Sequence, residues 1–305
     1  MAKAKDMELE QMSMGEIDAL HWTSNMKKQG YHIQKGFFKE SYLSNINKTC
    51  CKIINLEKNF KKLGFGNQTF RNGNIFTSNL LLKSNVFHDL LTNNGLLNFP
   101  SQYLEEFILS EYKIISSYKY DDFSYWWHRD YPYHLSITKE NINLGIIIPL
   151  INFNENNGST VYIPESHLLP DKPQDLDVQK PYSKQNVLET NLGDIFVYDG
   201  KLFHSGSKNL SGKLRNLISI QFVKNYITPC EDMKRQFFQN DIRNKTIENL
   251  MTQYHSPHIH KFGVNRNWSN TKYWAFLKYP YFVQKKIKNY YYKLVKLIYL
   301  NFCNQ

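Results

Sequence analysis

Long apolar runs are absent from this sequence of 305 residues. No stretch approaches the roughly 18 consecutive apolar residues of a membrane-spanning helix, which excludes an integral membrane protein. The opening segment, MAKAKDMELEQ, alternates in charge and has no apolar core, so we expect no secretory signal peptide. Hydrophobic residues make up 41% of the chain and charged residues 21%, a globular composition that excludes wholesale disorder and a coiled coil.

Cysteine is scarce. The chain has four: Cys50 and Cys51 are adjacent, while Cys230 and Cys303 lie far from them. This spacing is neither a disulfide framework nor the CxxC pair of a zinc or redox site. We therefore expect a reduced protein in the cytoplasm, with the Cys50–Cys51 pair packed in the core on an apolar helix face.

Acidic residues are missing after Glu248, although nine Lys and Arg residues follow it. The net charge of the whole chain is +11, so most of the excess lies in this C-terminal segment. The charge distribution argues against nucleic-acid binding by the whole protein, and no nucleic-acid partner is expected. A basic tail or a local anionic site is still compatible with it.

Helical patterns come first in the chain and strand patterns follow. Amphipathic spacing and helix-end signals predict helices over Met14–Gln29 and from about Leu43 to Gly64, separated by a short strand at Tyr31–Ile33. Segments rich in Ile, Val, Tyr and Phe then predict strands at Lys113–Tyr120, Asn143–Phe153, Ser159–Ile163, Asp194–Tyr198 and Leu214–Val223. Pro164–Tyr182, with four prolines, predicts a long loop. This order predicts an α+β fold with a β-barrel or sandwich core.

The sharpest local motif is Trp126-Trp127-His128-Arg129-Asp130. Residues i and i+2 of a strand point to the same side, so His128 and Asp130 can hold one metal ion together. A lone HxD motif is more often structural than functional. It becomes informative with His204 far downstream, because two histidines and one carboxylate on one face suit a non-haem Fe(II) site with open positions.

Arg215 lies eleven residues beyond His204 and begins a predicted strand. Strand alternation places Arg215, Leu217, Ser219 and Gln221 on one face, which is more polar than the other. We interpret this face as a cavity wall whose guanidinium binds a carboxylate in a bidentate manner. The alternative is a surface arginine on an edge strand.

Taken together, the motifs resemble the phytanoyl-CoA dioxygenase family of Fe(II)- and 2-oxoglutarate-dependent oxygenases. The similarity runs from about Gly30 to Val223. Its residues are His128-Arg129-Asp130, Asn157-Gly158-Ser159-Thr160, Ile163-Pro164-Glu165-Ser166-His167, Gly193-Asp194, Asp199-Gly200, His204-Ser205-Gly206, Asn209 and Arg215. Glu165 stands where the family usually has glycine, a departure confined to one turn. The resemblance implies a double-stranded β-helix core of the jelly-roll or cupin type.

The resemblance also implies the roles of individual residues. His128, Asp130 and His204 would bind iron, and Arg215 would bind the distal carboxylate of 2-oxoglutarate, with Lys113 or Lys83 as the next basic candidates. Thr160 occupies a position that often faces this co-substrate. The reaction implied consumes O₂ and 2-oxoglutarate, releases succinate and CO₂, and oxidises an unactivated C–H bond. The carboxylate of Asp130 favours hydroxylation over halogenation, which needs that coordination position for chloride.

The substrate is a small organic molecule that the sequence does not identify. Candidate substrate contacts are Trp126, which packs in the core in the alternative interpretation, and Tyr131, Tyr133 and His134 just after the HxD motif. We expect the pocket to lie between barrel strands and the segments 131–141 and 168–185. The other function classes are a binding protein on the same fold without turnover and a membrane-surface protein.

The membrane hypothesis rests on the C-terminal segment. We expect an oxygenase domain over residues 1–228, with its core at about 30–228, and a basic, aromatic helical extension over 229–305. Pro280–Phe302 predicts a moderately amphipathic basic helix, which either packs against the barrel or contacts an anionic membrane. His255, His258 and His260 favour a solvated loop over a zinc site, because no cysteine or carboxylate accompanies them.

Overall fold

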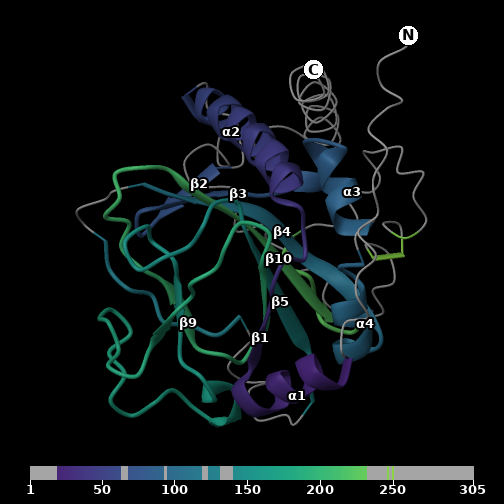
Figure 1. Cartoon of the computed structure of the whole chain (residues 1–305), viewed down its shortest axis with the longest axis vertical. Helices are drawn as coiled ribbons and strands as arrows, with labels where there is room; N and C mark the ends of the chain where they lie inside the picture. Colours follow the sequence, from purple (N-terminus) through teal and green to yellow (C-terminus); the bar gives the residue numbers. More distant parts are fainter. Residues whose placement is uncertain are drawn as a thin grey trace, which may run out of the picture.

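The structure is a computed structural model that describes residues 19–62, 68–92, 95–118, 123–130, 140–231, 246 and 249–250. The predicted helix at Pro280–Phe302 and the histidines of the HSPHIH segment lie outside the described residues. Two antiparallel sheets face each other, and most helices cover the outer side of the larger sheet (Figure 1).

The larger sheet has the strand order β1-β8-β5-β10-β4-β3-β2. In that order the strands are Tyr31–Gln34, Ile195–Asp199, Asn143–Pro149, Arg215–Lys224, Phe107–Ser117, Asn74–Thr77 and Gln68–Arg71. The smaller sheet has the order β7-β6-β9, with strands Asn186–Val187, Thr160–Tyr162 and His204–Gly206. Every recorded strand pair is antiparallel, and neighbours in the sheet are mostly distant in sequence. This is the arrangement expected of a double-stranded β-helix.

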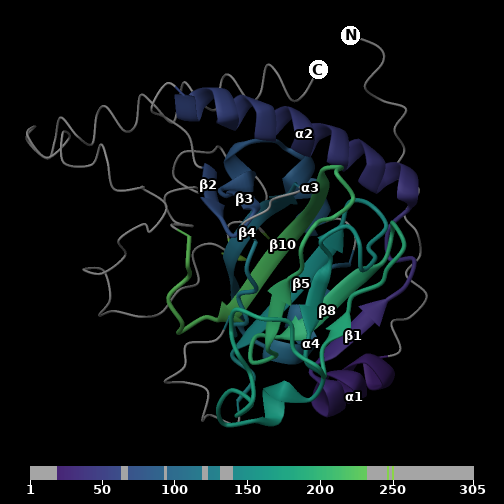
Figure 2. The ribbon, with the colours of Figure 1, turned by 90° about the vertical axis from the view of Figure 1, so that its left-hand side faces the viewer.

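The helices are α1 (Ala19–Gln29), α2 (Glu40–Lys62), α3 (Val86–Thr92) and α4 (Asn98–Leu104), with single 3₁₀ turns at Leu80–Leu82 and Ser166–Leu168. Figure 2 shows α2 across one end of the large sheet and α1 at the other end, near β1. The predicted stripe of α2 is correct: Leu43, Ile46, Cys50 and Ile53 have no exposed surface and pack into the main core. The described cysteines, Cys50, Cys51 and Cys230, form no disulfide with one another.

Strand β10 separates two environments. Ile218, Ile220 and Phe222 pack with the helices in the main core. The alternate residues Arg215, Leu217, Ser219 and Gln221 line a cavity of about 360 Å³. The alternation predicted from the sequence is therefore confirmed, and the polar side chains of this strand face the cavity.

Each predicted strand is present but displaced at one or both ends, and four further strands, β2, β3, β7 and β9, were not predicted. Strand β4 begins at Phe107, six residues before the predicted start, and β5 ends at Pro149 rather than Phe153. The β2–β3 hairpin was not predicted. Its turn, Asn72-Gly73, has φ values of 48° and 71°, the left-handed conformation that an Asn-Gly pair adopts in a two-residue hairpin. The segment 164–182 contains no strand, as predicted.

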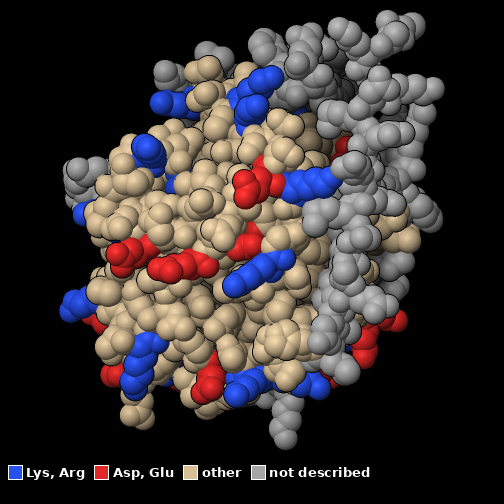
Figure 3. All heavy atoms as spheres, in the orientation of Figure 1, with Lys and Arg blue, Asp and Glu red and all other residues tan. Residues whose placement is uncertain are grey.

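The described surface mixes charges of both signs. On the face shown in Figure 3, Lys and Arg side chains lie among Asp and Glu side chains without forming one large patch. Among the helices that the structure describes, none combines the length and apolar character needed to cross a membrane.

Candidate metal and co-substrate site

The two predicted histidine ligands are brought together by the backbone. His128 lies in an extended segment that forms a single antiparallel bridge to His204 at the start of β9, rather than in a long strand. The backbone N–H of each residue donates to the carbonyl of the other over 3.1 Å. As a result, the imidazole centroids are only 4.3 Å apart, although 75 positions separate the residues in the chain.

Each histidine is oriented by its Nδ1 atom. His128 Nδ1 lies 2.8 Å from the Trp126 carbonyl, and His204 Nδ1 lies 3.0 Å from the Leu202 carbonyl. A carbonyl can only accept, so both Nδ1 atoms carry a proton, and the lone pair of each neutral imidazole is then on Nε2. Burial lowers the pKa of His204 to about 4 despite the opposing charge of Asp130. The neutral, Nε2-facing imidazole is the form that binds a metal ion.

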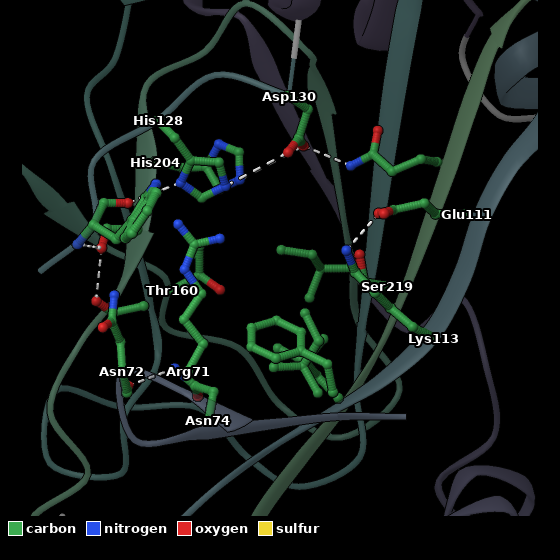
Figure 4. A pocket seen from close by; sticks show the side chains of 18 of the residues that line it. Arg71, Asn72, Asn74, Glu111, Lys113, His128, Asp130, Thr160, His204 and Ser219 are labelled. Carbon is green, nitrogen blue, oxygen red and sulfur yellow. Dashed lines mark hydrogen bonds and ion pairs between the residues drawn. The ribbon is translucent and has the colours of Figure 1, made fainter. Parts of the chain in front are cut away.

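Asp130 completes the cluster at the top of the view in Figure 4. Its Oδ1 lies 3.5 Å from Nε2 of His128, and its Oδ2 lies 3.6 Å from Nε2 of His204. Burial opposes ionisation of Asp130, but the neighbouring His204 and His128 and a hydrogen bond from Tyr198 hold the pKa of the carboxyl far below its usual range.

The donor set fits a divalent metal ion. One ligand atom from each of His128, Asp130 and His204 lies within 4.8 Å of the others, so a single ion can contact all three. All three side chains line the same cavity, and two-histidine, one-carboxylate sites of this kind leave coordination positions open on the other side of the ion. The sequence prediction that these residues meet is confirmed.

Arg215 lies in the wall of the same cavity with only 2% of its surface exposed. Its Nη2 donates to the Gly158 carbonyl over 2.6 Å and to Asn74 Oδ1 over 3.4 Å. Its Nε is buried without a hydrogen-bond partner, and no carboxylate pairs with it among the residues that the structure describes. Burial without a counter-ion lowers its pKa to about 10. A buried guanidinium with an unused donor is suited to the carboxylate of a bound ligand.

The Asn157-Gly158-Ser159 motif contacts Arg215, because the Gly158 carbonyl accepts a hydrogen bond from its guanidinium. Gly158 has a φ of 76°, and a Cβ atom there would lie 2.9 Å from Cβ of Asn209. Asn157 and Asn209 form an isolated antiparallel bridge, and Asn209 Nδ2 donates to the Ser117 carbonyl over 3.0 Å. Motifs separated by about 50 residues thus converge beside Arg215, which explains why they occur together in the sequence.

Thr160 and Trp126 also line the cavity. Thr160 is buried at the start of β6, opposite Gly206 of β9. Trp126 is 48% exposed, so the alternative interpretation of core packing is wrong; Trp127, at 2%, is the core tryptophan. Arg71 from the β2–β3 hairpin stacks on Trp126, with its Cζ 3.1 Å from the ring centroid. Sequence reasoning missed Arg71, although the Asn72-Gly73 turn could have revealed the hairpin that carries it.

The two alternative basic residues, Lys113 and Lys83, differ in their position relative to the cavity. Lys113 lines the cavity and forms an ion pair with Glu111, on the wall opposite Arg71 in Figure 4. Lys83 is paired with Glu57, and both side chains are almost completely buried away from the cavity lining. The suggestion that Lys83 could replace Arg215 is therefore wrong, because its charge is committed to another contact.

Among the described residues, the cavity wall comes from segments other than 131–141 and 168–185, which were expected to form it. Tyr131, Tyr133 and His134 lie outside the described residues. No residue of 168–185 lines the cavity; instead, it is lined by Arg71, Asn72, Asn74 and Phe76 of the hairpin and by Phe123, Ser124 and Trp126. Sequence reasoning also missed the roles of Tyr198 and Gln221, which contact Asp130 through cross-strand geometry that no local motif encodes.

Comparisons with known proteins agree with this geometry. The profile of the family described as "Phytanoyl-CoA dioxygenase (PhyH)" matches residues 26–217. Dioxygenase olcK of Penicillium canescens is 26% identical over 261 residues, covering 80% of both chains. An uncharacterized Mycobacterium tuberculosis protein, Rv1501, is 30% identical over 117 residues, covering 38% of this chain and 40% of its own.

Solved structures share the fold at low sequence identity. HygX from Streptomyces hygroscopicus, with nickel and 2-oxoglutarate bound, has a TM-score of 0.55 at 14% identity, over 68% of this chain and 88% of its own. The 2-oxoglutarate-dependent epimerase SnoN from nogalamycin biosynthesis has a TM-score of 0.53 at 14% identity, over 68% and 81%. The family profile covers more than half of the chain, including both metal-ligand motifs and Arg215, so this protein belongs to the phytanoyl-CoA dioxygenase family.

Proposed function

We propose that this protein is an Fe(II)- and 2-oxoglutarate-dependent dioxygenase that hydroxylates a C–H bond of a small organic substrate. The observation that carries the proposal is one cavity with two complementary ends. One end holds two imidazoles with free Nε2 atoms and a carboxylate, and the other holds a buried guanidinium with an unused Nε. A metal ion and a dicarboxylate satisfy these two ends at once.

His128, Asp130 and His204 are assigned to iron, and Arg215 to the distal carboxylate of 2-oxoglutarate. Thr160 lies in the cavity lining with both groups and is assigned a contact with the co-substrate. When bound, the iron and 2-oxoglutarate supply the oxidising chemistry with O₂. The chain would orient the co-substrate through Arg215, and it holds both imidazoles in place through their Nδ1 hydrogen bonds.

In the overall reaction, 2-oxoglutarate and the substrate each take up one oxygen atom of O₂. One oxygen atom of O₂ enters succinate as 2-oxoglutarate loses CO₂, and the other enters the substrate as a hydroxyl group. Asp130 supports this outcome over halogenation, because its carboxylate would take the coordination position that chloride would need. Trp126 and Arg71 at the exposed side of the cavity are assigned to contact with the substrate.

The test begins without a substrate. Anaerobic Fe(II) should bind one ion per chain, and 2-oxoglutarate should then produce a visible charge-transfer band. Exposure to O₂ should yield succinate, and a screen of small molecules should identify one that accelerates succinate formation. Its product should be heavier by one oxygen atom. A chlorinated product, or a product of unchanged mass such as an epimer, would refute hydroxylation; lack of succinate under every condition would refute the oxygenase itself.

A further inference from the structure

Two side chains from different strands donate hydrogen bonds to one oxygen of Asp130. The hydroxyl of Tyr198 on β8 and Nε2 of Gln221 on β10 each lie 2.6 Å from Oδ2. Nε2 of Gln221 also lies 2.7 Å from the Tyr198 hydroxyl oxygen, so its two hydrogens serve both neighbours. A carboxylate oxygen offers about two lone-pair positions, and both positions on Oδ2 are therefore occupied.

The direction of these hydrogen bonds follows from chemistry. A carboxylate oxygen can only accept, so the Tyr198 hydroxyl donates to Oδ2 of Asp130. Reversing the Gln221 amide would place its oxygen beside Oδ2, where two acceptors repel. In the observed orientation Gln221 Oε1 is buried without a partner among the described residues, a cost that the contact with Asp130 must outweigh.

A glycine makes room for this arrangement. Tyr198, Gly145 and Gln221 are direct neighbours across the strands β8, β5 and β10. A Cβ atom at Gly145 would lie 2.2 Å from Cζ of Tyr198. The phenol ring therefore lies across β5 and reaches Gln221 only because position 145 has no side chain. The same ring packs edge-on against His204, with centroids 4.8 Å apart.

We infer that Tyr198 and Gln221 are positioning residues that hold Asp130 through Oδ2, so that Oδ1 alone is offered to the metal ion. A carboxylate that binds through one oxygen leaves free the coordination position that a chelating carboxylate would take. Gly145 supports this arrangement because its lack of a side chain leaves room for the Tyr198 ring. This inference rests on the proposed metal site, but its variants leave all three ligands and Arg215 in place.

The experiment uses Co(II), whose visible absorption reports coordination number, with the full-length protein and no substrate. Tyr198→Phe and Gln221→Met each remove one donor and keep the side-chain bulk. Both should weaken Co(II) binding by roughly 10- to 100-fold, the usual effect of losing a hydrogen bond to a metal ligand, and should change the visible spectrum. Gly145→Ala should displace the Tyr198 ring and so reproduce the Tyr198→Phe spectrum, although it replaces no residue that contacts Asp130.

Tyr162→Phe is the matched control, because Tyr162 belongs to the same aromatic cluster as Tyr198 but pairs its ring with Tyr31 and Phe196. It should leave the affinity and spectrum of Co(II) unchanged. Wild-type affinity and spectrum in both Tyr198→Phe and Gln221→Met would overturn the inference and leave the metal site intact. Failure of the wild type to bind Co(II) would instead overturn the proposed function, and this inference with it.

Discussion

Alternate residues of strand β10 form two faces, one packed in the apolar core and one lining the cavity. On the helix side, Ile218, Ile220 and Phe222 are completely buried among apolar neighbours. On the cavity side, Arg215 and Gln221 are almost equally buried, yet each retains a polar atom with no partner among the described residues. Burial alone therefore does not distinguish the two faces; hydrogen-bond satisfaction does.

This difference indicates what each face contributes. Apolar burial stabilises the fold by about 25 cal/mol per Å² of surface removed from water. A buried polar atom without a partner costs about 1–3 kcal/mol, so the cavity face reduces the stability of the ligand-free protein. Under the proposed function, bound 2-oxoglutarate would supply a partner for the buried Nε of Arg215. Substitutions on the two faces should then separate binding from stability.

The largest expected effect is at the metal end. His128→Ala, Asp130→Ala and His204→Ala should each abolish the charge-transfer band of the anaerobic Fe(II) and 2-oxoglutarate complex, because the chain supplies only these three ligands in the described site. Circular dichroism should show that each variant is folded. A band of wild-type strength in all three variants would refute the ligand assignment.

Arg215→Ala should have the next largest effect. It removes one partner of the proposed buried ion pair with 2-oxoglutarate, which costs about 3–5 kcal/mol, or roughly two to four orders of magnitude in affinity. Fe(II) should still bind, and titration of the charge-transfer band with 2-oxoglutarate measures the change. Arg215→Lys should recover only part of the affinity, because an ammonium replaces a planar fork. Unchanged affinity in Arg215→Ala would transfer the role to Lys113, the lysine among the described residues that line the cavity.

Ile220→Ala tests the opposite face. Removing this completely buried side chain should lower the free energy of unfolding by about 2–5 kcal/mol, as large-to-small core substitutions do. Denaturant titration measures this loss. The affinity for 2-oxoglutarate should stay at the wild-type value, because Ile220 points away from the cavity. A large loss of 2-oxoglutarate binding in the folded variant would show that the two faces are not independent.

The sequence predicts the parts of the site that lie in local motifs. The HxD pair, His204 and the alternation that begins at Arg215 are readable because each depends on residues within a few positions of one another. The ends of β4 were misplaced, since its residues 107–112 mix buried and half-buried positions without a clean alternation.

Other features depend on register between distant strands. Tyr198, Gly145 and Gln221 meet only because β8, β5 and β10 pair as they do, and no spacing in the sequence reveals that row. Arg71 reaches the cavity through a hairpin whose Asn72-Gly73 turn is visible in the sequence, but the pairing of that hairpin with β4 is not. Local patterns therefore identify ligands, and tertiary pairing determines what orients them.

The smallest expected effect is at the exposed side of the cavity, where Arg71 stacks on Trp126. Cation–π contacts at exposed sites contribute about 0.5–1 kcal/mol, so Trp126→Ala and Arg71→Gln should each change the free energy of unfolding by no more than about 1 kcal/mol. The double variant should lose less than the sum of the two single losses, because the contact is shared. Fe(II) binding and uncoupled succinate formation should stay near wild type, whereas KM for the substrate found by screening should rise in both single variants. An unchanged KM would remove Trp126 and Arg71 from the substrate site, and a lost charge-transfer band would instead place them at the metal and co-substrate end.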